Sequence, residues 1–145
     1  MHRLPPLLAA PLLLSLGAIG PMPPRVDEIP CKLRTHVEEV DSYKKLPQPL
    51  RALIEQQLGD MADKNEAYNR TAAGGGKGPP RRFLRGGHAG NRWFLWYKQG
   101  GIGLTTHIFA FEATPGRPAR ELGRRMFFAN QHDPCALTDS LLAAP

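Results

Sequence analysis

Serine is scarce in this chain, and its scarcity argues against a large class of catalytic mechanisms. The 145 residues include three serines, and none of them lies in a Gly-x-Ser-x-Gly sequence, the strained turn that presents a nucleophilic serine in α/β-hydrolases. Paired metal ligands are also missing, because the five histidines and two cysteines form no His-x-x-x-His or Cys-x-x-Cys spacing. We therefore expect no serine nucleophile, no metal site and no cofactor.

A cysteine nucleophile has little support either. His132 precedes Cys135 by three residues, and His36 follows Cys31 by five residues. A thiolate nucleophile, however, requires a cysteine that is not paired in a disulfide. The sequence thus favours a protein that is not an enzyme, and it leaves open a small hydrolase whose site it does not identify.

The first twenty residues form a separate segment, and the rest of the chain has room for one domain. Residues 1–20 start with a single charge at Arg3, continue with a leucine-rich stretch and end with small residues near Gly17 and Gly20. This order is typical of a secretory signal peptide. A membrane-spanning helix needs about 20 apolar residues and is disfavoured by prolines such as those found here. We predict an exported protein, secreted or periplasmic, with no membrane span in the mature chain and with its cleavage position left open.

The predicted mature chain has a proline-rich lead-in over residues 21–30 and one small domain over residues 31–145. Leu, Ile, Val and Phe make up about a fifth of it, the level near which chains begin to resemble disordered ones. The only two cysteines, Cys31 and Cys135, lie near the two ends of the domain. In an exported protein they are predicted to form a disulfide, whereas in a cytosolic protein they would be two buried thiols.

An amphipathic helix over Pro49–Tyr68 is the clearest predicted element. Apolar residues recur there at steps of three and four, and most charged residues lie elsewhere around the helix. Residues 31–46 fit either a helical turn or an edge strand and stay unassigned. Beyond Pro80 the hydrophobic period changes to two, which predicts strands. The four predicted strands are Arg81–Arg85, Arg92–Lys98, Leu104–Glu112 and Leu122–Phe128.

Glycine clusters separate three of these strands. Residues 86–91 and 99–103 are predicted to be hairpin connections, and Pro115 and Pro118 mark a third, looser turn. The expected fold class is α+β, with one amphipathic helix followed by, and packed on, an antiparallel meander of about four strands.

Aromatic side chains occupy both faces of the second predicted strand. Alternation places Trp93, Leu95 and Tyr97 on one face and Phe94 and Trp96 on the other. The helix can cover one face. The other face is expected to be covered by the segment before the helix together with the C-terminal tail, by a second copy of the chain or by a ligand.

Basic residues concentrate in the same part of the chain, because residues 70–125 hold eleven Lys and Arg against two Glu. Aromatic side chains interleaved with arginines can bind polyanions. An exported protein meets acidic polysaccharide, anionic lipid or an acidic partner before it meets chromosomal nucleic acid, which we do not expect as a partner. The candidate binding residues are Arg82, Arg85, Arg92, Trp93, Trp96, Tyr97 and His107.

The predicted helix and meander resemble the element order of cystatin-like folds over residues 48–128. Cystatins carry a Gln-x-Val-x-Gly loop between the two strands after the helix, and Gln99-Gly-Gly-Ile-Gly103 lies at the analogous place with Gly101 instead of the valine. The Pro-Trp dipeptide of the next hairpin and the disulfide arrangement of the family are absent. The resemblance therefore concerns the fold, and inhibition of cysteine proteases does not follow from it.

The leading functional prediction is a small exported, non-catalytic binding or structural domain. It would contact a macromolecular partner, a polyanion or a second copy of itself through the aromatic and arginine side chains of its sheet. The alternatives are a cystatin-like or other protein inhibitor that acts through hairpin loops, and the small hydrolase. The three differ in what they should expose: an uncovered aromatic patch, ordered projecting loops, or a deep cleft that holds His107 and a carboxylate.

Overall fold

A computed structural model describes residues 31–71, 76–101, 105–127 and 132–145. The predicted signal peptide (residues 1–20) and the lead-in (residues 21–30) lie outside the described residues, as do parts of the predicted loop after Gln99. In the part of the chain that is described, no helix is long and apolar enough to cross a membrane.

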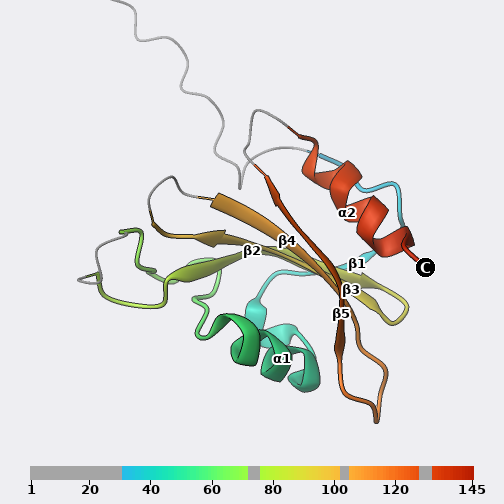
Figure 1. Cartoon of the computed structure of the whole chain (residues 1–145), viewed down its shortest axis with the longest axis horizontal. Coiled ribbons are helices and arrows are strands. Elements are labelled where there is room, and N and C mark those ends of the chain that lie inside the picture. The colour runs from blue at the N-terminus through green and yellow to red at the C-terminus, as the bar shows by residue number, and fades with distance from the viewer. Residues whose placement is uncertain (1–30, 72–75, 102–104, 128–131) are drawn as a thin grey trace, which may run out of the picture.

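The centre of the fold is a five-stranded antiparallel sheet with the strand order β1-β2-β3-β4-β5 (Figure 1). Each strand after the first is a neighbour of the one before it in sequence, so β2 to β5 form a meander. The α+β class and the antiparallel sheet are thereby confirmed. The strands are β1 (Glu38–Val40), β2 (Arg81–Ala89), β3 (Arg92–Gln99), β4 (Thr105–Glu112) and β5 (Arg120–Phe127).

Two helices cover opposite faces of this sheet (Figure 1). A short 3-10 turn, η2 (Tyr43–Lys45), leads into α1 (Gln48–Leu58), and α2 (Pro134–Ala143) follows β5. The predicted first helix is therefore ten residues too long at its C-terminal end. Helix α1 ends at Leu58 because Gly59 adopts φ 74°, a left-handed conformation that ends helices readily.

Strand β2 is longer than predicted, because the glycines assigned to a hairpin connection belong to the strand. Gly86 and Gly87 pair with β1 on one side and β3 on the other, and the turn contains only Gly90 and Asn91. A Cβ atom on Gly87 would lie 2.7 Å from the carbonyl oxygen of Glu38. Glycine is thus required here for the close approach of β1 rather than for a turn.

The element order differs from the prediction at both ends. The unassigned segment before the helix supplies the edge strand β1, and a second helix, α2, ends the chain. In α2, Pro134 lies in the first turn, and the Asp133 carboxylate accepts hydrogen bonds from the backbone N–H of Cys135 (2.9 Å) and Ala136 (3.3 Å). These are favourable features of a helix N-terminus.

The sheet separates two hydrophobic cores, as the alternation of aromatic residues along β3 predicts. Leu95 and Tyr97 pack with α1, whereas Phe94 and Trp96 pack with α2. The second face is therefore covered by the C-terminal helix and by the segment that precedes β1, which contributes the buried Leu33. This outcome agrees with the first of the three expected covers and leaves no broad aromatic face exposed on β3.

Two long-range links fix α2 to the start of the domain. Cys31 and Cys135 form the predicted disulfide, with an S–S distance of 2.08 Å and a Cα–Cα distance of 5.9 Å. The Asp139 carboxylate accepts hydrogen bonds from the backbone N–H groups of Arg34 and Thr35, both at 2.9 Å. Both ends of the described domain are therefore anchored on the same face of the sheet.

Candidate functional site

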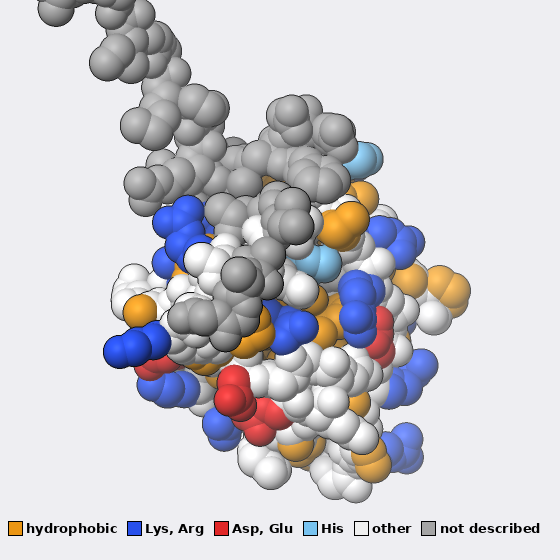
Figure 2. Space-filling model, turned by 60° about the vertical axis from the view of Figure 1, so that its left-hand side comes forward, with side chains coloured by type: hydrophobic (Ala, Val, Ile, Leu, Met, Phe, Trp, Pro, Cys, Tyr) orange, Lys and Arg blue, Asp and Glu red, His pale blue; other side chains and the backbone are white. Residues whose placement is uncertain are grey.

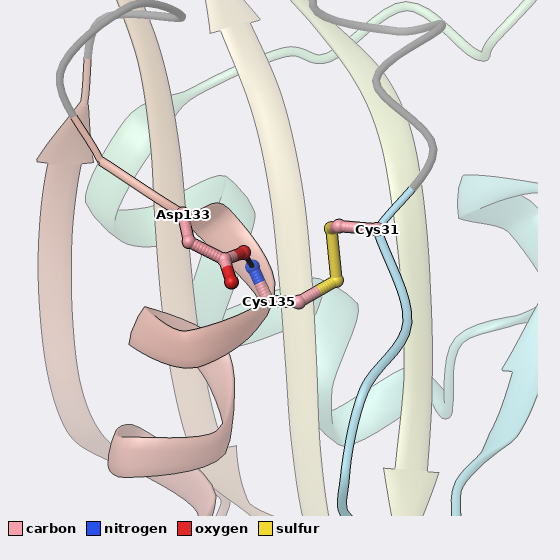
Figure 3. A group of neighbouring side chains, drawn as sticks. All are labelled: Cys31, Asp133 and Cys135. Atoms are coloured by element: carbon pink, nitrogen blue, oxygen red, sulfur yellow. Dashed lines mark hydrogen bonds between the residues drawn. A yellow bond between two sulfur atoms is a disulfide. The ribbon is translucent and has the colours of Figure 1, made fainter.

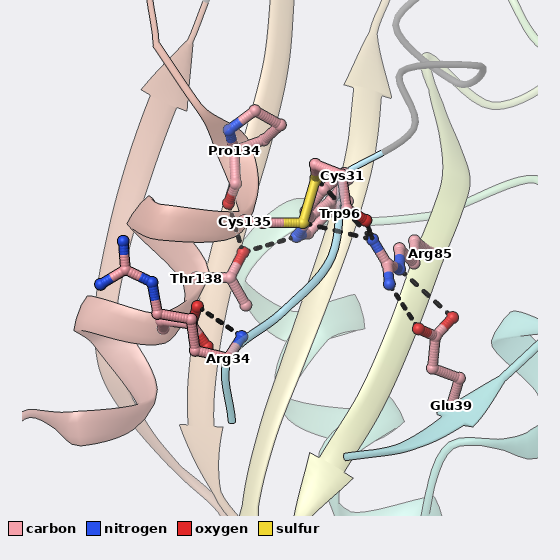
Figure 4. Close-up of polar contacts among 9 residues, drawn as sticks. Cys31, Arg34, Glu39, Arg85, Trp96, Pro134, Cys135 and Thr138 are labelled. Atoms are coloured by element: carbon pink, nitrogen blue, oxygen red, sulfur yellow. Dashed lines mark hydrogen bonds and ion pairs between the residues drawn. A yellow bond between two sulfur atoms is a disulfide. The ribbon is translucent and has the colours of Figure 1, made fainter. Parts of the chain in front are cut away.

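Arg85, a predicted binding residue, lies at the junction of β1, β2 and the disulfide (Figure 4). Its guanidinium forms an ion pair with Glu39 through two hydrogen bonds. The same group donates to the carbonyl oxygen of Cys31 (3.4 Å), lies 3.5 Å from the sulfur of Cys135 and sits 5.1 Å above the Trp96 ring. These contacts give Arg85 a role in holding the domain together.

Trp96 is almost fully buried and joins the sheet to α2 (Figure 4). Its indole N–H donates to the hydroxyl of Thr138 at 2.9 Å, and that hydroxyl donates to the carbonyl oxygen of Pro134 at 2.8 Å. The side chain is therefore part of the interior and is not available to a partner.

Arg92 and Arg82 also make contacts within the domain. Arg92 donates to the carbonyl oxygens of Leu142 (2.5 Å) and Ala144, where α2 ends and backbone acceptors lack helical partners. The guanidinium of Arg82 lies 4.7 Å from the centre of the Tyr68 ring, a cation–π geometry. The structure therefore does not bring Arg82, Arg85 and Arg92 together into one exposed basic surface.

Tyr97 and His107 form a stacked pair on the α1 face, with ring centres 4.9 Å apart and planes 6° apart. Burial, followed by the positive charges of Arg124 and Arg81, lowers the pKa of His107. Burial also raises the pKa of the Tyr97 hydroxyl. His107 is half-buried, and the charged groups that act on it, Arg124 and Arg81, are cations, which add to the effect of burial in disfavouring protonation of its imidazole and so lower its pKa.

Trp93, another predicted binding residue, lies at an apolar hollow in the surface. It borders an apolar groove of about 530 Å³, hereafter the Trp93 groove. Pockets that bind ligands commonly have volumes of about 300–1,000 Å³. The groove lies where the start of α1, the β2–β3 turn and the segment after β4 meet. Its lining residues are Pro47, Pro49, His88, Gly90, Asn91, Trp93, Ala113, Thr114 and Pro115.

The wall formed by β2 and β3 is an aromatic pair. His88 and Trp93 are directly opposite each other in the sheet, and their rings stack with centres 4.3 Å apart. His88 Nδ1 donates to the carbonyl oxygen of Gly90 at 3.1 Å, and its Nε2 lies 3.5 Å from the Glu38 carboxylate. These contacts fix the ring against the indole, so the aromatic wall is preformed.

Most backbone acceptors around the Trp93 groove already have partners. The carbonyl oxygens of Asn91, Thr114 and Pro47 accept hydrogen bonds from backbone N–H groups, and that of Gly90 accepts from His88. The Asn91 amide donates to Glu112 at 3.0 Å. In contrast, no described residue accepts a hydrogen bond from the indole N–H of Trp93. This N–H is also not one of the buried polar atoms without a partner, so it is not fully buried. The indole N–H is therefore a donor without a described partner, on a residue that lines the groove.

Sequence reasoning identified Trp93 but missed its neighbours in the groove. Pro49 was predicted only as the first residue of the helix, His88 was placed in a hairpin connection, and Pro47 was given no binding role. The signal available in the sequence was the pairing of His88 with Trp93 across a two-residue turn, which places both side chains on one face. The three prolines of the lining, Pro47, Pro49 and Pro115, could not be assigned to the groove, because they reach it from other parts of the fold.

Two further hollows lie beside β1 and are lined by charged groups. The smaller, of about 220 Å³, is bordered by Asp41, Lys45, Lys64 and Arg85 among others. Asp41 and Lys45 pair with each other at 2.8 Å, and Arg85 pairs with Glu39. These pairs neutralise most of the charge of the smaller hollow. The larger hollow, of about 440 Å³, is lined by Lys32, Arg34 and Arg85 with Glu39 as the acidic residue, so its lining carries a net positive charge.

Cys31, Asp133 and Cys135 place potential metal-ligand atoms within 4.8 Å of one another (Figure 3). The two sulfurs, however, are bonded to each other, and the Asp133 carboxylate accepts hydrogen bonds from the first turn of α2. The arrangement is thus occupied by structural bonds, since thiolates rather than disulfide sulfurs ligate metals.

Lys and Arg side chains are spread over the face in Figure 2, with hydrophobic side chains between them, and do not gather in one patch.

No family model, curated protein or solved structure matches this chain. The functional argument therefore depends on the geometry of the Trp93 groove.

Proposed function

We propose that this protein is a small exported, non-catalytic binding domain that holds an apolar segment of a macromolecular partner in the Trp93 groove. The observation that carries the proposal is the groove itself: a preformed aromatic wall, three prolines and no charged side chain among its lining residues. Apolar clefts with a few directed polar groups are the usual form of a binding site. The disulfide between the ends of the domain supports export, because such bonds persist in oxidising compartments.

Protein inhibition through projecting loops is the second candidate. The β2–β3 turn at Gly90 and Asn91 and the segment after β4 both border the groove, so an inserted pair of loops would carry it into a partner's cleft. The loop that follows Gln99, on which the cystatin resemblance depended, extends outside the described residues. A polyanion-binding surface has less support, because Arg85 and Arg92 are engaged within the domain.

A peptide selection tests the binding function. A library of random peptides is selected for binding to the full mature protein, and the recovered peptides are then measured against Trp93→Ala and Met126→Ala variants. Met126 is a matched control, since it is exposed (54%) and lies at the opposite end of β5 from the groove. We expect the selection to yield peptides that lose their affinity for the Trp93→Ala variant and keep it for the Met126→Ala variant.

A second variant keeps this test valid if Trp93→Ala folds poorly. Pro49 is exposed in the first turn of α1, where a carboxylate is favourable for the helix. Pro49→Glu therefore adds a charge to the groove without disturbing the core, and we expect it to weaken the same peptides. Recovery of peptides that bind both groove variants as well as the wild type would contradict the proposed function.

A further inference from the structure

Resting on the proposed function, we infer that the occupant of the Trp93 groove is a proline-rich segment of a partner protein in the polyproline II conformation. Such segments bind to aromatic-lined grooves because their extended shape is formed before binding and little conformational entropy is lost. The groove provides the aromatic wall in the form of the stacked His88 and Trp93 rings.

The hydrogen-bonding groups around the groove distinguish this occupant from others. An ordinary peptide brings backbone N–H donors, and burying them without acceptors is costly. Here the carbonyl oxygens of Pro47, Gly90 and Asn91 already accept hydrogen bonds. Proline has no N–H and presents only carbonyl acceptors. A proline-rich segment therefore leaves no donor unpaired, and its carbonyls match the available indole N–H of Trp93.

The charges near the groove add a second requirement. The lining residues include no Lys, Arg, Asp or Glu, which disfavours phosphorylated or carboxylate ligands because no Lys or Arg lies in the wall to pair with them. At the edge, the Glu38 side chain is 80% exposed and lies 3.5 Å from the His88 ring. A basic residue beside the prolines would pair with this carboxylate, so the preferred segment combines prolines with a flanking Arg or Lys.

Sugars are a poorer match for the same groove. A polyhydroxyl ligand can stack on Trp93, but each of its hydroxyls needs a hydrogen-bond partner when buried. The acceptors described above are engaged, and the Asn91 amide is already bonded to Glu112. The complement of donors and acceptors thus favours a ligand that is apolar and rich in acceptors.

The test uses two peptides of identical composition. The first is an acetylated, amidated octaproline of L-proline followed by arginine, and the second contains D-proline, which forms the mirror-image helix. Binding to the full mature protein is followed by calorimetry and by the ¹H–¹⁵N signal of the Trp93 indole, which is identified by its absence in Trp93→Phe. We expect saturable binding of the L-peptide and a shift of this signal, with the D-peptide binding at least about tenfold more weakly, or 1.4 kcal/mol.

Two substitutions test the named contacts. Trp93→Phe keeps an aromatic ring and removes the N–H, so the affinity for the L-peptide should fall. Glu38→Gln changes an exposed side chain, and it should weaken the L-peptide but not its analogue in which arginine is replaced by alanine. Equal binding of the L- and D-peptides, or an affinity unaffected by Trp93→Phe, would overturn the inference.

A control variant addresses the prolines of the chain itself. In it, Pro21, Pro23 and Pro24 are all replaced by alanine. Unchanged or tighter binding of the L-peptide in this variant supports the inference, whereas loss of binding contradicts it. A failure of the polyproline inference can be distinguished from a failure of the proposed binding function. If selected peptides depend on Trp93 but contain no proline, the binding function stands and the polyproline inference fails.

Discussion

The hydrogen bond between Trp96 and Thr138 shows how single side chains connect the two layers of this fold. It is buried, with Trp96 at 3% and Thr138 at 0% exposure, and it links β3 to the middle of α2. A buried donor that loses its acceptor costs more than the bond contributed, because the donor stays desolvated. The pair therefore makes the position of α2 on the sheet specific as well as stable.

Thr138→Val should lower the free energy of unfolding by about 1–3 kcal/mol, since it leaves the indole N–H of Trp96 buried without a partner. In a Trp96→Phe background the same substitution should cost less, because no donor remains. Chemical denaturation of the two single variants and the double variant gives the coupling between them. Additive effects would show that the bond does not stabilise the fold.

Tyr43 predicts how stability depends on alkaline pH. Burial, followed by the negative charge of Glu55, raises the pKa of its hydroxyl to about 12. Between about pH 10 and 12 the unfolded chain loses this proton while the folded chain keeps it, so stability falls by up to about 1.4 kcal/mol per pH unit. Tyr43→Phe should reduce this slope in urea titrations. A slope identical to that of the wild type would exclude Tyr43 as its source.

Among the secondary-structure elements, α2 depends on contacts at both of its ends. Asp133 caps its first turn, and Arg92 donates to the carbonyl oxygens of Leu142 and Ala144 at its last turn. The helix has ten residues, and isolated helices of this length are marginal in water. Its stability therefore comes from these end contacts and from packing on β3 to β5.

Asp133→Ala should destabilise the domain by about 1 kcal/mol, because the N–H groups of Cys135 and Ala136 lose their acceptor. Ser140→Ala on the exposed side of the same helix is the control and should change stability by less than about 0.5 kcal/mol. Thermal unfolding of the disulfide-bonded forms measures both. Equal effects of the two substitutions would show that the cap does not determine the stability of α2.

The strands of the meander were largely predictable, and the helices were less so. Alternation along β3 correctly assigned its side chains to two faces, because the period of a strand is fixed by backbone geometry. α2 could not be predicted from its own residues, because its stability depends on the sheet and the disulfide. Gly86 and Gly87 suggested a turn, since a sequence does not show which glycines are required by a neighbouring strand.

The candidate site was less predictable than the fold. Among the candidate binding residues, Trp93 is partly exposed and borders the groove, whereas Trp96 and Tyr97 are buried. The sequence could not separate them, because residues on both faces of a doubly covered sheet have the same composition. The groove itself combines the start of α1, a turn and a later segment, so that it exists only after the chain has folded.

For the molecule as a whole, the disulfide closes nearly the entire described domain into one loop. Cys31 and Cys135 are separated by 104 positions, and the bridge anchors α2 against the face that contains Trp96. The apolar content of the chain is low, so the core on each face of the sheet is small. We therefore expect the covalent link between the ends to supply a large share of the stability.

Replacing both cysteines by serine should lower the free energy of unfolding by about 4–5 kcal/mol, the loop-entropy value for a closed loop of about 100 residues. Adding a reductant to the wild type should have a similar effect and none on the double variant. Urea unfolding under both conditions measures the loss. A change below about 1 kcal/mol would show that packing and hydrogen bonds alone hold the two ends together.

The affinity of one selected peptide for groove and charge variants distinguishes binding in the Trp93 groove from binding to a basic surface. Two exposed arginines away from the groove, Arg70 and Arg125, are replaced by glutamine as the charge control. We predict that Trp93→Ala raises the dissociation constant at least about tenfold, or 1.4 kcal/mol, and that the arginine variant leaves it unchanged at physiological salt. A peptide released by loss of the arginines and retained by Trp93→Ala would contradict the account.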